Sequence, residues 1–113
     1  MDFVVVFITV GSTEEGEQLA RALVEEKLAA CVNRIAGVQS TYRWQGQVVT
    51  DQEQLLVVKT SAAMFDQLEQ RVRELHSYDV PEIVTVPIVR GSAAYLNWLS
   101  DALAAPDDET TRD

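Results

Sequence analysis

The sequence has little of several features that define specialised proteins. Its 113 residues include one cysteine, Cys31, so no internal disulfide can form, and no CxxC pair is present that could hold a structural zinc. Basic residues number nine against eighteen acidic ones, which gives a formal charge of −9. Such a surface repels phosphate groups and anionic lipid heads, so nucleic-acid binding and membrane-surface binding are disfavoured. It suits cations, although many proteins are acidic only for solubility.

Long hydrophobic runs are also missing. The apolar run at the N-terminus covers about eight residues, whereas a helix that spans a bilayer needs roughly twenty. The run has no basic leader and no small-residue cleavage site. We therefore expect a buried strand, no membrane insertion and a cytoplasmic location.

The sequence has one histidine, His76, and no motif of nucleophilic, nucleotide-dependent or zinc-dependent catalysis. A Ser-His-Asp or Cys-His system would have to be built around His76, and nothing in the sequence shows that Cys31 meets it. The apolar neighbours of Cys31 predict a buried, ordinary thiol. We expect that the protein is not an enzyme.

Hydrophobic periodicity predicts one domain over residues 1–105. Its expected elements are a strand at 3–10, a helix at 13–29, strands at 31–43 and 47–60, a helix from Ser61 to His76, a strand at 83–89 and a last helix from Gly91-Ser92. From Pro106 the tail has no apolar residue to bury, so residues 106–113 are expected to form a disordered acidic tail.

Local signals support several of these boundaries. Ser12 and Glu15 have the spacing of a capping box, and Ser61 is the expected N-cap of the second helix. Gly46 supplies the positive φ angle of a tight hairpin turn, and Gly37 predicts a bulge or a bend. Pro87 lacks an N–H group and predicts an edge strand or a bulge.

The order β-α-β-β-α-β with an extra C-terminal helix predicts an α+β fold. It is the ferredoxin-like (split β-α-β) sandwich, with an antiparallel sheet and both crossover helices on one face. The hairpin arms are about a dozen residues each, whereas strands typically have about five or six. A hairpin of this length and an uncovered sheet face predict that the chain associates with itself.

Two side-chain groups allow alternative interpretations. His76 could stabilise the end of its helix, or it could bind a metal with help from Asp79 and Glu82. Glu53 and Lys59 should share one strand face, where they could line a common cleft or form a weak surface ion pair. Tyr42 and Trp44, near the hairpin tip, are more typical of subunit contacts than of a binding platform.

Five ordered motifs resemble those of the CutA family of divalent-cation tolerance proteins, over about residues 4–103. The motifs are Glu26–Asn33, Tyr42–Gly46, Glu53 through Lys59-Thr60, His76–Ile83 and Tyr95–Leu99. The resemblance implies a homotrimer, with strands paired across subunits, and an architecture similar to that of trimeric PII signalling proteins. It also implies a link to tolerance of copper and other divalent metals.

Carried over residue by residue, the resemblance gives candidate sites. His76 and Glu53 match positions associated with metal or with the intersubunit cleft, and Cys31 is a third candidate ligand. Lys59, Tyr78, Trp44 and Glu82 are expected to line or border the cleft. The family usually has proline where this chain has Ser77. Some members have a strand-one cysteine where it has Ile8, which removes a soft ligand.

These observations favour a non-enzymatic, trimeric cytoplasmic protein that binds divalent metal weakly in intersubunit clefts. Copper or zinc is the candidate metal, and no cofactor is required. One alternative is a PII-like sensor in which Lys59 and Arg90 attract a metabolite or anion. A further alternative is a structural adaptor trimer that binds another protein.

Overall fold

Four strands and three α-helices form the part of the chain that the structure, a computed structural model, describes: residues 2–104. In chain order they are β1 (Phe3–Val10), α1 (Thr13–Glu25), β2 (Cys31–Trp44), β3 (Gln47–Ser61), a 3₁₀ turn (Ala62–Met64), α2 (Phe65–Leu75), β4 (Ile83–Pro87) and α3 (Ala93–Ala104). The predicted tail at 106–113 lies outside the described residues. Within residues 2–104, no helix is long and apolar enough to cross a membrane.

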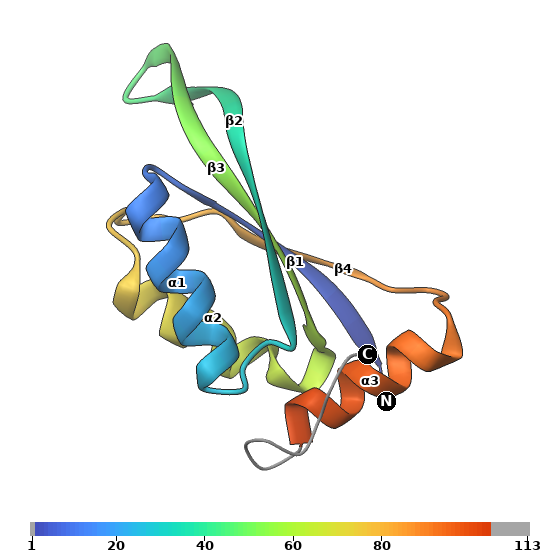
Figure 1. The fold of residues 1–113 in the computed structure, drawn as a ribbon. Coiled ribbons are helices and arrows are strands. Elements are labelled where there is room, and N and C mark those ends of the chain that lie inside the picture. Colours follow the sequence, from blue (N-terminus) through green and yellow to red (C-terminus); the bar gives the residue numbers. More distant parts are fainter. Residues whose placement is uncertain (1, 105–113) are drawn as a thin grey trace.

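The strands form one antiparallel sheet in the order β2-β3-β1-β4, with α1 and α2 together on one face (Figure 1). The predicted α+β class and antiparallel sheet are therefore confirmed, and the strand order is that of the split β-α-β arrangement. The core between sheet and helices is apolar. Its fully buried side chains include Val6, Ile8, Leu56 and Val58 from the sheet and Leu19, Leu23, Leu68 and Val72 from the helices.

The β2–β3 hairpin is long, with arms of 14 and 15 residues. Gly37, at φ 77°, lies where the register shifts between Ile35 and Val38, which confirms the predicted bulge. At the tip, Gln45 and Gly46 both have positive φ, as a two-residue turn with the twist of a hairpin requires. The outer part of the hairpin projects beyond the helices (Figure 1), and the described chain measures 48 × 27 × 25 Å.

The sheet face opposite α1 and α2 is largely uncovered, and we call it the open face. Strand alternation and register place these apolar side chains on it: Val5, Phe7, Ile35, Leu55, Val57, Val84 and Val86. Ile35, Val84 and Val86 are each 44–50% exposed. The helix α3 packs on Phe3 and Ala30, at the end of the sheet near the start of β1 (Figure 1). The open face therefore keeps a contiguous apolar surface within one chain.

The first helix is shorter than predicted: α1 ends at Glu25, not at residue 29. Lys27 adopts a left-handed conformation at φ 59°. The Leu28 N–H donates to the Leu23 carbonyl at 2.9 Å, and the Lys27 N–H donates to the Val24 carbonyl at 3.1 Å. This is the Schellman pattern, usually built on glycine, and it places Leu28 back against the core. The apolar spacing therefore continued past the true end of the helix.

Two other boundaries differ from the prediction. The Ser61 side chain makes no cap hydrogen bond, and the Ala62–Met64 turn separates it from the start of α2 at Phe65. The last strand ends at Pro87 rather than at residue 89. Among residues 2–104 it pairs only with β1, so Pro87 does lie on an edge strand, where a missing N–H can be tolerated.

Gly16 is buried in α1 against Gln54 of β3. A Cβ atom at position 16 would lie 2.3 Å from the Gln54 Oε1 atom, which is itself buried without a hydrogen-bond partner in the described part of the chain. We expect Gly16→Ala to lower the free energy of unfolding by about 1–3 kcal/mol through overpacking, measured by urea denaturation. In a Gln54→Ala background the same change should cost much less, because the severe clash is gone, only the 3.3 Å approach to Val10 Cγ2 remains, and alanine favours helix. An equal loss in both backgrounds would contradict this explanation.

Candidate functional site

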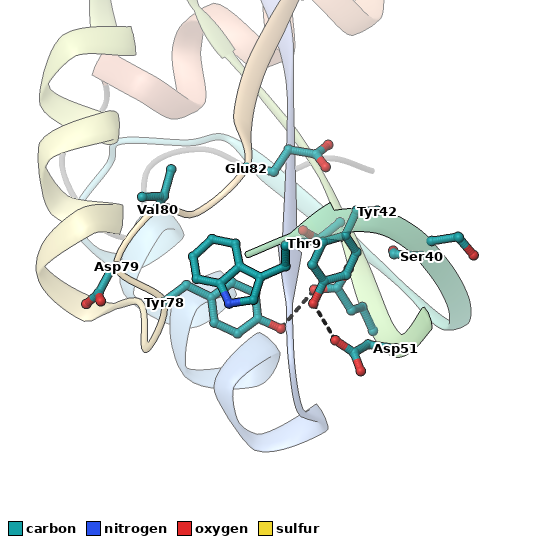
Figure 2. Close-up of a pocket in the computed structure, with 11 residues that line it drawn as sticks. Thr9, Ser40, Tyr42, Asp51, Tyr78, Asp79, Val80 and Glu82 are labelled. Carbon is teal, nitrogen blue, oxygen red and sulfur yellow. Dashed lines mark hydrogen bonds between the residues drawn. The ribbon is translucent and has the colours of Figure 1, made fainter. Parts of the chain in front are cut away.

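A cavity of about 560 Å³ lies between the outer part of the hairpin and the loop that joins α2 to β4 (Figure 2). We call it the acidic cavity. The hairpin and the end of β1 contribute Thr9, Ser40, Thr41, Tyr42, Trp44, Asp51 and Glu53, and the loop contributes Tyr78, Asp79, Val80 and Glu82. The cavity exists because the hairpin extends past the helices and the loop folds back towards it.

Among residues 2–104, four carboxylates line this cavity, and this part of the chain contributes no lysine, arginine or histidine to it. Asp51 and Glu53 come from β3, and Asp79 and Glu82 from the loop. Glu53 is only 8% exposed. A carboxylate can accept about four hydrogen bonds, and among residues 2–104 Glu53 receives one, from Tyr78. The cavity therefore has a negative potential and spare acceptor capacity.

Two tyrosine hydroxyls point into the same part of the cavity (Figure 2). Tyr78 donates to Glu53 Oε2 at 2.8 Å, and Tyr42 donates to Asp51. The bond to Asp51 is the main cause that raises the pKa of Tyr42. Burial is the main cause that raises the pKa of Tyr78, and the bond to Glu53 adds to it. Both hydroxyls therefore stay protonated at neutral pH and remain donors to the carboxylates.

His76 lies behind the loop, with a side chain that is 0% exposed. The Tyr78 N–H donates to its Nδ1 atom at 3.1 Å, so the proton of the neutral ring lies on Nε2. Nε2 then donates to the Thr9 carbonyl at 2.7 Å. Neither nitrogen keeps a free lone pair, so metal binding by His76 would require one of these bonds to break. The ring joins the end of α2 to β1.

The loop is also attached to the start of α1. The Glu15 carboxylate accepts from the Ser77 N–H at 2.7 Å and from the Ser77 hydroxyl at 3.0 Å. The expected capping box is therefore only half formed. Ser12 does accept from the Glu15 N–H at 3.2 Å, but the Glu15 side chain turns to the loop instead of to Ser12. The serine at position 77 gives the loop an N–H donor that a proline would lack.

The predicted site residues fall into two groups. Glu53, Tyr78, Trp44 and Glu82 line the acidic cavity, so the structure brings these four together. Asp51 and Thr9 also belong to this site and were not predicted from the sequence, and Tyr42, for which a subunit contact is predicted, lines the cavity as well. The even spacing of Tyr42 from Trp44, and of Asp51 from Glu53, was the available signal, since it places each pair on one strand face.

Cys31 and Lys59 lie elsewhere. They are paired in register near the inner end of the hairpin, where Lys59 donates to Asn33. Lys59 shares a strand face with Glu53, as predicted, but it is about 20 Å further along β3. It therefore neither pairs with Glu53 nor lines the same cavity within one chain. Ile8 lies in the core beneath the helices, so a side chain at position 8 does not reach the cavity.

No three histidine, cysteine, aspartate or glutamate side chains within residues 2–104 converge closely enough to hold a metal ion. His76, Glu53 and Cys31 in particular do not meet in one chain. A site that uses these residues would therefore need ligands from a second chain, and the ligand roles of the three stay predictions.

Comparison with known families gives a match to the model of the CutA1 divalent ion tolerance protein over residues 4–102. The chain belongs to the CutA1 family. Among curated CutA1 relatives, the divalent-cation tolerance protein CutA of Thermus thermophilus is 57% identical over 97 residues, which cover 86% of this chain and 94% of the relative. The chloroplastic protein CutA of Arabidopsis thaliana is 46% identical over 99 residues, which cover 88% of this chain.

Solved CutA1 structures share the fold. The Thermus thermophilus protein has a TM-score of 0.84 at 57% identity, covering 86% of this chain and 94% of that one. CutA1 from Oryza sativa has a TM-score of 0.89 at 44% identity, covering 90% and 94%. The chain spans only about half the length of the curated plant relatives, 54% for the Arabidopsis protein.

Proposed function

We propose that this CutA1 chain is a non-enzymatic cation-binding protein that contributes to tolerance of divalent metals. The observation that supports this most directly is the acidic cavity, with its four carboxylates and no basic side chain. Carboxylate oxygens suit hard and borderline divalent cations. Because no three of these carboxylates converge within residues 2–104, copper or zinc would be held there by one or two carboxylates and by water, which predicts weak binding.

The proposal includes assembly into a homotrimer through the open face. Its support is the exposed apolar surface of that face, together with the outer hairpin, whose arms pair with each other but whose outward edges have no partner strand among residues 2–104. If the open face and the outer hairpin packed against other copies, the face of the sheet that α3 covers only at one end would be fully covered. The acidic cavity would then lie beside a neighbouring subunit.

The PII-like alternative is less well supported at this cavity. An anionic metabolite would face four carboxylates, and neither Lys59 nor Arg90 is part of the lining.

The cytoplasmic location also stays a prediction. One relative of known structure, from Archaeoglobus fulgidus, is described as a periplasmic divalent cation tolerance protein.

Calorimetric titration of the full chain with CuCl₂ and with ZnCl₂ tests the metal part. We expect weak binding, with Kd on the order of 10⁻⁴ M, as in weak oxygen-ligand sites. Glu53→Gln keeps an oxygen that can accept the Tyr78 hydrogen bond but removes the buried charge, so it should weaken binding several-fold. Glu17→Gln, an exposed change on α1, is the matched control and should have no effect. Equal heats from the parent and both variants would contradict a site at Glu53.

A further inference from the structure

The acidic cavity has features that a metal ion alone does not use. Three aromatic rings line it, those of Tyr42, Trp44 and Tyr78, and each is 36–52% exposed within one chain. A hydrated divalent ion gains little from ring faces, because its water shell keeps it away from them. An organic cation sheds water more easily and is attracted to the negative face of a ring. The aromatic walls therefore favour an organic cation over a hydrated metal.

The size of the cavity points the same way. Six waters around a metal ion occupy roughly 180 Å³ at their share of liquid volume. The cavity, at about 560 Å³, is about three times as large and lies within the range of small-molecule sites. A hydrated ion would leave most of it to bulk water. A ligand with an apolar body and a charged end would fill it.

The hydrogen-bonding groups further restrict the ligand. The hydroxyls of Tyr42 and Tyr78 already donate to Asp51 and Glu53, so neither proton is available to a ligand. The carboxylates keep spare lone pairs, and Glu53 is nine-tenths buried with one donor among residues 2–104. A ligand with several N–H donors and a positive charge would satisfy them, whereas a ligand rich in acceptors would not.

We infer that the acidic cavity binds an alkylammonium ion, whose ammonium end contacts Glu53 within reach of the ring faces of Tyr42, Trp44 and Tyr78, and whose hydrocarbon part packs on the same rings. This inference rests on the proposed function, that the cavity binds cations, and it specifies the class of cation. Asp79 and Glu82 at the loop side would accept a second ammonium group, so a diamine fits better than a monoamine.

Calorimetric titration of the full chain with 1,4-diaminobutane at low ionic strength tests the inference, with 1,4-butanediol as the neutral probe of equal length. We expect saturable heat with the diamine, one site per chain, and none with the diol. Raising the salt concentration should weaken diamine binding, because the attraction is electrostatic. No diamine heat above dilution, or equal heats from diamine and diol, would overturn the inference.

Position 42 offers a matched pair of variants. Tyr42→Phe removes the hydroxyl and keeps the ring, so diamine affinity should stay within about twofold of the parent. Tyr42→Leu removes the ring, and the loss of one cation–π contact should weaken binding about fivefold. Copper binding should be the same in both variants, because the hydrated ion does not use the ring. Equal diamine affinity in the leucine and phenylalanine variants would contradict the aromatic part.

The two proposals fail in different ways. If copper or zinc binds in a Glu53-dependent manner and the diamine does not, the metal proposal stands and the alkylammonium inference is wrong. If the diamine binds and neither metal does, the cavity is an organic-cation site and the metal proposal is wrong. If none of the three binds, both are wrong.

Discussion

A chain that carries both Val84→Glu and Val86→Glu is expected to behave in solution as a single subunit, whereas the parent chain should have the mass of three. Both valines lie on β4 and contribute to the open face, where they are 50% and 44% exposed. Two charges there could not be desolvated in an interface without several kcal/mol of cost each. Size-exclusion chromatography with light scattering, at micromolar concentration, measures the mass.

The matched control is Val24→Glu, a change of the same chemistry on the outer side of α1, where Val24 is 41% exposed. It should leave the mass at three chains, because α1 lies on the face away from the proposed interface. Circular dichroism of the double variant shows whether the single subunit is folded. If it unfolds, the assembly is still demonstrated when unfolding of the parent depends on protein concentration. A parent with the mass of one chain would contradict the trimer.

Much of the fold follows from local patterns in the sequence. The unbroken apolar run of Phe3–Val10 and the helical spacing of Leu19 and Leu23 were enough to predict β1 and the buried stripe of α1. Gly37 and Gly46 predicted the bulge and the turn because both need positive φ. The end of α1 could not be predicted in this way. A lysine there adopts the conformation that glycine usually supplies, and only the packing of the following residue makes this favourable.

The candidate site was harder to predict because contacts between distant segments create it. Glu53 is joined to Tyr78, and Glu15 to Ser77, across gaps that no local pattern reveals. The even separation of Glu53 and Lys59 in the sequence correctly predicted that both lie on one face of β3. An even separation does not show how far apart two residues lie along the strand. The interpretation of His76 had a similar limit. The sequence placed it at the end of α2, and the structure shows which carbonyl and which N–H occupy its two nitrogens.

The contacts of His76 predict a large effect on stability. His76→Phe keeps an aromatic ring of similar size but removes the donor to the Thr9 carbonyl and the acceptor for the Tyr78 N–H. The Thr9 carbonyl would then lack this partner in a buried setting, at about 1–3 kcal/mol, and the part-buried Tyr78 N–H would cost less. We expect the free energy of unfolding to fall by about 2–4 kcal/mol in the presence of EDTA, measured by urea denaturation at fixed protein concentration.

The same variant separates the two interpretations of His76. If His76 has a structural role, His76→Phe lowers the free energy of unfolding even without metal. The increase in melting temperature on adding CuCl₂ should then stay close to that of the parent. A metal ligand would give the opposite result, with stability in EDTA unchanged and the copper-induced increase lost.

Ser77→Ala is a useful comparison, because it removes only the hydroxyl contact to Glu15 and keeps the N–H donor. It should cost about 1 kcal/mol or less, since the contact is exposed and the stronger backbone bond remains. A loss as large as that of His76→Phe would mean that stability depends on the anchoring of the loop to α1 rather than on the imidazole.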